Sequence, residues 1–197
     1  MPKKSRQSPK PPLSEAELIE RLRAKYRDGY AVFGHVRNST GHSRVVRTAD
    51  ALVLGLWPSR GLDLHGMEIK SHRSDLLREL KNPAKADEIA RYCDYWWIVA
   101  GSPDVAKPGE LPKPWGLMIP HGSGLKIAKG AELLEADPLS RGLVAAIVRR
   151  LRETEDMRDG RVRAEERRKH QEERDSLQPS RELQASLQLS QQSEQRL

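Results

Sequence analysis

An acid and a base stand two residues apart in the segment Gly66-Met67-Glu68-Ile69-Lys70-Ser71. Residues two apart on a β-strand project from the same face, so Glu68 and Lys70 emerge together while Met67 and Ile69 point the other way. Placing two charges on an apolar strand costs free energy unless the charges are paired. A lone Glu-x-Lys is usually a weak surface ion pair, so its meaning depends on its surroundings.

A second carboxylate, Asp50, precedes another apolar run. If the two runs pair across the loop Trp57–Gly61, Asp50 approaches Glu68. Two carboxylates and the backbone carbonyl of Ile69 would make an all-oxygen site, which suits Mg²⁺ or Mn²⁺ rather than zinc. Such a metal polarises a phosphate and lowers the pKa of bound water. Lys70 would orient that water or neutralise developing charge.

The elements that position these residues follow from hydrophobic spacing and turn residues. We expect a helix opened by a capping box at Ser14, strands over 31–37, 45–56 and 62–70, a helix over 75–80 capped by Ser74, a helix over 84–93, a buried strand over 95–100, a hairpin over 115–128, and a last helix opening at 137. The helices before strand 95–100 favour a parallel crossover. The expected fold is α/β, a mixed central sheet flanked by helices, with disordered or solvated-helix ends.

Composition divides the 197 residues into three parts. Residues 1–12 form a basic leader with a charge of +4, expected to be disordered. Residues 13–151 carry +4 and contain all the expected strands, so we take them as one folded domain. Residues 152–197 carry −1 and form a charged, then Gln/Ser-rich tail, with disorder expected from 178 onward. A basic domain favours a phosphate-rich partner.

Several classes of protein are excluded. One cysteine, Cys93, rules out an internal disulfide and a cysteine-based zinc site. The six histidines lack metal-ligand spacing. No run approaches the roughly 18 apolar residues of a membrane span, and the leader lacks the apolar core of a signal peptide. We therefore expect no membrane partner and a cytoplasmic location.

The order of these elements, with an acid on one strand and Glu-x-Lys on the next, resembles the PD-(D/E)XK nuclease superfamily. Within it, the chain is most similar to the MmcB-like DNA-repair nucleases and related small phage and bacterial proteins. The features that carry this resemblance are Arg47-Thr48-Ala49-Asp50, Glu68-Ile69-Lys70-Ser71 followed by Ser74-Asp75, and Lys85 leading to Arg91-Tyr92-Cys93-Asp94 before Trp96-Trp97-Ile98-Val99. The resemblance covers roughly residues 30–100 and implies a restriction-endonuclease-like fold.

The resemblance also implies roles for individual residues. Asp50 and Glu68 would be metal ligands, together with the carbonyl of Ile69, and Lys70 would be the catalytic lysine. Lys85 would be an accessory residue near the scissile phosphate, or else a solvated helix lysine. The implied activity is that of a Mg²⁺- or Mn²⁺-dependent deoxyribonuclease that hydrolyses DNA phosphodiesters. The alternative is a catalytically inactive nuclease-fold module that binds nucleic acid or a repair partner.

Some positions stay open at this point. Many superfamily members add a glutamate from the first helix, and Glu15, Glu17 and Glu20 are the candidates. Asp75 is either a family position or a favourable acid at a helix N-terminus. Whether two copies pair to cut both strands is also open. Further residues that could contact nucleic acid are Trp96 and Trp97, by stacking on bases unless they belong to the core, and Arg37, Arg44, Arg47, Arg60 and Arg73, by binding phosphates.

Overall fold

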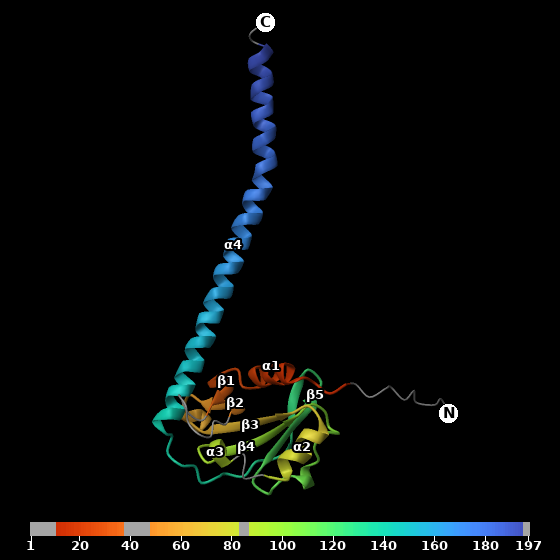
Figure 1. Ribbon diagram of the computed structural model, residues 1–197, viewed down its shortest axis with the longest axis vertical. Helices are drawn as coiled ribbons and strands as arrows, with labels where there is room; N and C mark the ends of the chain where they lie inside the picture. The colour runs from red at the N-terminus through yellow and green to blue at the C-terminus, as the bar shows by residue number, and fades with distance from the viewer. Residues whose placement is uncertain (1–10, 38–47, 83–86, 195–197) are drawn as a thin grey trace, which may run out of the picture. The chain divides into compact units, whose positions relative to one another are not determined.

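The computed structural model describes residues 11–37, 48–82 and 87–194, and within them six strands form one mixed sheet (Figure 1). The strands are β1 (Tyr30–Arg37), β2 (Thr48–Gly55), β3 (Leu64–Lys70), β4 (Tyr95–Ala100), β5 (Gly116–His121) and β6 (Gly124–Lys129), and they lie in this order across the sheet. The β1–β2, β2–β3 and β5–β6 pairs are antiparallel, whereas β3–β4 and β4–β5 are parallel. The expected α/β class and the parallel crossover are confirmed.

Helices cover both faces of the sheet. They are α1 (Glu15–Lys25), α2 (Arg73–Leu80), α3 (Asp87–Ala90) and the first part of α4 (Arg141–Glu194). Figure 1 shows α1 on one side of the sheet and α2 and α3 on the other. Leu18 and Leu22 of α1 pack with Met67 in one buried cluster, and Leu76 of α2 packs with Leu52 in a second. The sheet is therefore buried on both faces, as a sheet with parallel strands requires.

Two buried tryptophans on β4 fix the spacing of the central strands. The rings of Trp96 and Trp97 lie where a Cβ on Gly66 or Gly116 would come within 2.3 Å of ring carbons. Any side chain at either glycine would displace a ring. Because Trp96 is 1% exposed and Trp97 is 6% exposed, both belong to the core, and neither stacks on a base.

The helix boundaries differ from expectation in three places. The capping box at Ser14 is confirmed, but α2 begins at Arg73 after His72, so Ser74 lies inside its first turn rather than capping it. The helix expected over 84–93 ends at Ala90 within the described residues, because the chain turns there to enter β4. The last helix opens at Arg141 rather than 137, where the hydroxyl of Ser140 accepts a hydrogen bond from a first-turn N–H.

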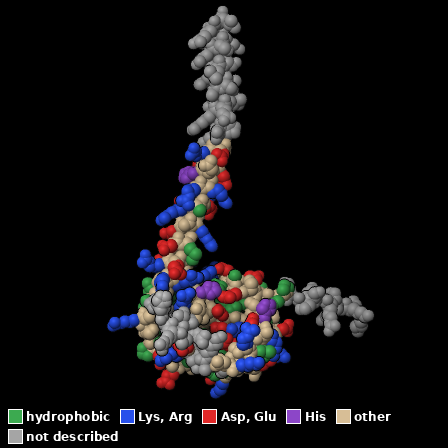
Figure 2. All heavy atoms as spheres, viewed as in Figure 1, with side chains coloured by type: hydrophobic (Ala, Val, Ile, Leu, Met, Phe, Trp, Pro, Cys, Tyr) green, Lys and Arg blue, Asp and Glu red, His purple; other side chains and the backbone are tan. Residues whose placement is uncertain are grey.

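The chain divides into two compact units after Arg150. In the second unit, α4 runs to Glu194, which agrees with the solvated-helix alternative expected for the chain ends and not with the disorder expected over 178–194. Basic and acidic side chains cover most of the described surface of this helix (Figure 2), and pairs such as Arg168–Glu172 and Lys169–Glu165 support it. None of the helices in the described part of the chain has both the length and the apolar character needed to cross a bilayer.

Candidate active site at the fork between strands β2 and β3

Strands β2 and β3 separate where the predicted acidic residues lie. Their antiparallel pairing runs from Leu54–Leu64 to Ala51–Met67, and both strands continue beyond that last pair. Asp50 and Glu68 are the first residues of the two separated segments. The pairing inferred from sequence is therefore correct, and it places the two carboxyl-bearing residues on facing arms of a fork.

The Asp50 side chain joins the two arms. Its Oδ2 accepts a hydrogen bond of 2.7 Å from the backbone N–H of Ile69. This contact takes the place of a strand-to-strand bond between main chains at the fork. It also holds the Asp50 carboxylate next to the segment of β3 that carries Glu68 and Lys70.

Lys70 lies between two glutamates. Its Nζ is 2.5 Å from Glu68 Oε1 and 3.2 Å from Glu79 Oε2, and the side chains of Lys70, Glu68 and Glu79 are 10%, 17% and 9% exposed. The Lys70–Glu68 contact agrees with the strand parity that put both on one face. Glu79, in the last turn of α2, was not identified from sequence. The sequence feature that could have identified Glu79 is its position three residues after Leu76, because residues three apart lie on the same helix face and Leu76 is buried.

Burial and neighbouring negative charges raise the pKa values of Asp50 and Glu68. Burial raises the pKa of Glu68 to about 7, and the negative charge of Asp50 adds to that effect against the opposing Lys70. Burial also raises the pKa of Asp50, although the hydrogen bond from Ile69 opposes it. Burial alone would lower the pKa of Lys70, but its contacts with Glu68 and Glu79 raise it. The carboxylates of Asp50, Glu68 and Glu79 therefore outnumber the single positive charge of Lys70 that lies among them.

The structure separates the three first-helix glutamates. Glu17 completes the capping box with Ser14, and Glu20 forms an ion pair with Arg23. Glu15 instead faces the fork, where its charge contributes to raising the pKa of Asp50 after the larger effect of burial. Of these three glutamates, Glu15 is therefore the one whose charge acts on Asp50.

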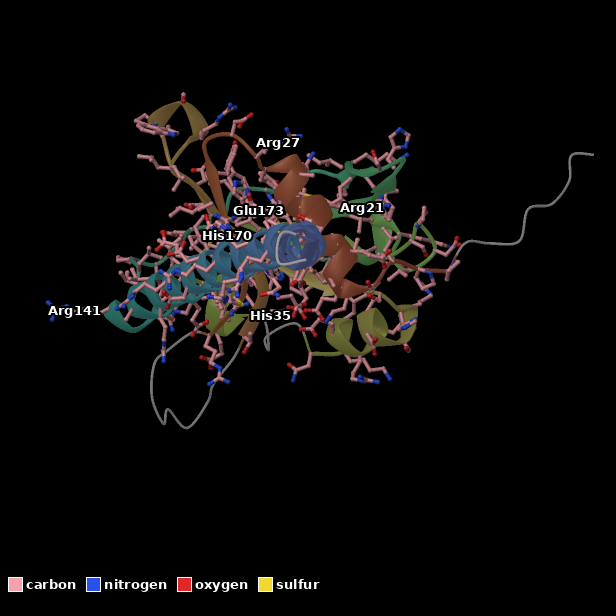
Figure 3. All side chains as sticks on the ribbon, turned by 90° about the horizontal axis from the view of Figure 1, so that it is seen from above. Arg21, Arg27, His35, Arg141, His170 and Glu173 are labelled. Atoms are coloured by element: carbon pink, nitrogen blue, oxygen red, sulfur yellow. The ribbon has the colours of Figure 1, made fainter. Side chains whose placement is uncertain are left out.

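His35 is a second neighbour of the fork that sequence reasoning missed. The β1–β2 pairs Gly34–Ala51 and Val36–Ala49 place His35 opposite Asp50. Its backbone φ is +54°, in the left-handed region that few non-glycine residues adopt, and no sequence pattern signals this. Its Nδ1 lies 3.4 Å from Glu15 Oε1, and Figure 3 labels it on β1.

A pocket of about 440 Å³ lies beside the fork in the first unit. The residues that line it are Glu15, Ala16, Ile19, Glu20, Arg23, Gly34, His35 and Arg150. Arg150 closes one part of the wall by donating a 2.7 Å hydrogen bond to the carbonyl of Gly34. On α1, Arg21 (Figure 3) donates to the carbonyls of Gly122 and Gly124, which fixes the helix to the β5–β6 hairpin.

Other expected residues lie away from the fork or outside the described residues. Lys85 falls outside them, as do Arg44 and Arg47. Asp75 pairs with Arg78 on the surface of α2, and Arg73 pairs with Glu110. Arg60 lies in the loop at the far end of the β2–β3 hairpin, away from the fork.

The fork offers a divalent metal two carboxylates, those of Asp50 and Glu68. Among residues 11–37, 48–82 and 87–194, no three His, Cys, Asp or Glu side chains form a group able to hold one. Burial raises the pKa of both Asp50 and Glu68, and the charge of Asp50 raises that of Glu68 further, so a bound cation is favoured between them. Mg²⁺ commonly uses one or two carboxylates and keeps several waters, so Asp50 and Glu68 fit that mode.

Comparisons with known proteins show the fold alone. No protein-family model and no curated protein sequence matches this chain. The solved structure of the SPO1766 protein of unknown function from Silicibacter pomeroyi is similar, with a TM-score of 0.50 and 22% sequence identity. The similarity covers 77% of this chain and 96% of that one. At this identity the chain shares an α/β fold with that protein, and nothing follows about activity.

Proposed function

We propose that this chain is a Mg²⁺- or Mn²⁺-dependent deoxyribonuclease with a PD-(D/E)XK active site on a restriction-endonuclease-like core. The observation that carries the proposal is the fork, in which Asp50 and Glu68 occupy facing positions beside the buried Lys70. The raised pKa values of both acids indicate a place where a cation would relieve repulsion. Lys70 supplies one positive charge beside these acids, and a bound divalent cation would supply further positive charge.

The metal would be held by the carboxylates of Asp50 and Glu68, with the carbonyl of Ile69 as the third protein oxygen. When bound, it would polarise the scissile phosphate and lower the pKa of the attacking water. Lys70 holds a proton at Nζ, since its contacts with Glu68 and Glu79 stabilise the charged form. That charge would orient the water or stabilise the negative charge that develops on phosphate oxygens.

Two neighbouring acids have supporting roles in this proposal. Glu79 contacts Nζ of Lys70 at 3.2 Å and fixes the ammonium group from the side of α2. Glu15 adds a fourth carboxylate on the side of Asp50, matching the first-helix glutamate common in the superfamily. The net charge of +7 favours a DNA substrate. We propose a cytoplasmic site of action.

A second candidate is a catalytically inactive module of the same fold that binds nucleic acid or a repair partner. The observation that favours it is the ion pair between Lys70 and both Glu68 and Glu79, which offsets acidic charge at the fork without a metal. This candidate predicts nucleic-acid binding that divalent metal does not change, and no cleavage.

Cleavage of a DNA panel tests the proposal. The full chain should cut at least one of branched, flapped, single-stranded and duplex DNA with Mg²⁺ or Mn²⁺, and a chelator should stop it. Asp50→Ala, Glu68→Ala and Lys70→Ala should each abolish cleavage. As a matched control, Glu135→Gln alters an exposed acid and should cut like the parent. Equal cleavage by all three alanine variants would refute the assignment.

A further inference from the structure

The tip of the β2–β3 hairpin exposes three large apolar side chains. Leu56, Trp57 and Leu62 are 48%, 62% and 55% exposed. The other three tryptophans of the chain are at most 7% exposed. An exposed cluster of large apolar residues is the kind of surface feature that marks a binding site. The proposed active site does not use these residues.

The tip is built to hold this shape. Trp57 Cδ1 and the Arg60 side chain pack against Gly29, where an added Cβ would lie 3.1 to 3.3 Å from them. A Cβ on Gly55 would come within 2.6 Å of the Arg60 carbonyl oxygen, so the turn closes tightly there. Gly61 adopts φ +82°, which completes the short helix Pro58–Arg60. The turn thus fixes Trp57 in place while leaving most of its surface in solvent.

The side chains of Arg60 and Trp57 both lie against Gly29, which directly precedes Tyr30. The Arg60 guanidinium carbon lies 5.6 Å from the ring centroid of Tyr30, and Arg27 (Figure 3) is exposed in the turn before Gly29. Aromatic rings beside arginines are what proteins use to stack unpaired bases and to hold adjacent phosphates. Asp28 and Asp63 balance the charges of Arg27 and Arg60 at this end of the hairpin. We therefore expect stacking, rather than net charge, to make the main contribution.

The shape of the tip favours a nucleic acid over a protein partner. A stable protein interface needs about 800 Å² from each side, which a turn of a few residues does not offer. Unpaired bases need only one exposed ring. The tip also shares its hairpin with the fork, since β2 rises about 17 Å from Asp50 to Gly55 at roughly 3.3 Å per residue. A length of about 17 Å corresponds to about five base pairs along a DNA duplex.

We propose that the hairpin tip binds unpaired bases of DNA, with Trp57 stacking on a base and Arg60 contacting a phosphate. The inference rests on the proposed function and extends it to the substrate class, DNA that has unpaired nucleotides a few positions from the cut. Binding at the tip needs no metal and no cleavage. It can therefore be tested separately from the active site.

The test measures binding of a short oligodeoxythymidine and of a fully paired duplex of equal length to the full chain in a chelator. Trp57→Ala should weaken oligodeoxythymidine binding about 10-fold, which corresponds to about 1.4 kcal/mol, and should leave duplex binding within twofold. Trp57→Phe should keep most of the affinity. Arg60→Gln should reduce the slope of log binding constant against log salt concentration by about one, the value for one phosphate contact, whereas Trp57→Ala should leave this slope unchanged.

Fluorescence gives an independent readout, because Trp57 is the exposed indole in the described chain. Bound oligodeoxythymidine should protect it from acrylamide quenching. Leu133→Ala, at a residue that is 67% exposed elsewhere, is the matched control and should bind like the parent. The inference is overturned if Trp57→Ala binds oligodeoxythymidine normally, if it weakens both DNAs equally, if it alters only self-association, or if the parent fails to bind oligodeoxythymidine. Metal-dependent cleavage with normal binding by Trp57→Ala would overturn this inference alone.

Discussion

Glu68 should make the folded protein less stable as the pH rises in the absence of divalent metal. Its pKa moves from 4.5 to about 7 on folding, so the folded state binds the proton more tightly than the unfolded state. Stability must therefore fall as the pH rises from about 4.5 to about 7. Compared with its value well below pH 4.5, the free energy of unfolding is lower by about 3 kcal/mol at pH 8. At pH 5 it is lower by less than about 1 kcal/mol.

Glu68→Gln removes the charge and keeps the shape of the side chain. It should raise the free energy of unfolding by about 1 to 3 kcal/mol at pH 8, with little change at pH 5. The assay is urea unfolding in a chelator, followed by the fluorescence of the buried tryptophans. Added Mg²⁺ should stabilise the parent at pH 8 and leave Glu68→Gln unchanged, because the metal binds only the folded site.

The control is Glu135→Gln, which removes an exposed carboxylate and should leave stability unchanged at both pH values. The reasoning is refuted if Glu68→Gln is no more stable than the parent at pH 8. It is also refuted if the two proteins differ equally at pH 5 and pH 8, because the effect would then not come from ionisation of Glu68.

Three further predictions concern the residues around this site and the core. Burial lowers the pKa of His65, whose Nδ1 accepts a hydrogen bond from Trp97. The neutral imidazole therefore stabilises the folded state, and this stabilisation should be lost as the pH falls below about 6.5. In His65→Gln, the urea midpoint should change less with pH over that range. Lys70→Met leaves buried Glu79 and Glu68 without their cation, and it should lower the free energy of unfolding by about 3 kcal/mol at pH 8 and by less at pH 5. An equal loss at both pH values would contradict the charge argument. Ser14→Ala removes the capping box and should cost about 1 kcal/mol in urea unfolding, while a loss below a few tenths would show that the cap contributes little.

Local rules account for the parts of the site that sequence could predict. Strand parity placed Glu68 and Lys70 on one face, and the loop between two apolar runs predicted the hairpin that brings Asp50 to the fork. The remaining residues depend on tertiary structure. Glu79 reaches Lys70 only because α2 packs over β3, and His35 faces the site through a left-handed backbone that its residue type does not require.

The tail shows a different limit of sequence reasoning. A Gln/Ser-rich composition favours disorder by its lack of apolar residues, and that argument predicted no helix after 178. Gln, Leu and Glu are also good helix formers, so an exposed helix can continue without a core to pack against. In the structure α4 runs to Glu194.

Mn²⁺ binding to the full chain, measured by titration calorimetry, tests the central claim most directly, because it asks whether the fork holds a metal before any substrate is chosen. The proposed site predicts Mn²⁺ binding that Asp50→Asn and Glu68→Gln each abolish. Lys70→Met should keep the binding or strengthen it, since Lys70 competes for Glu68, and yet should not cleave DNA. Mn²⁺ binding that survives both Asp50→Asn and Glu68→Gln, or no binding by the parent, would contradict the account.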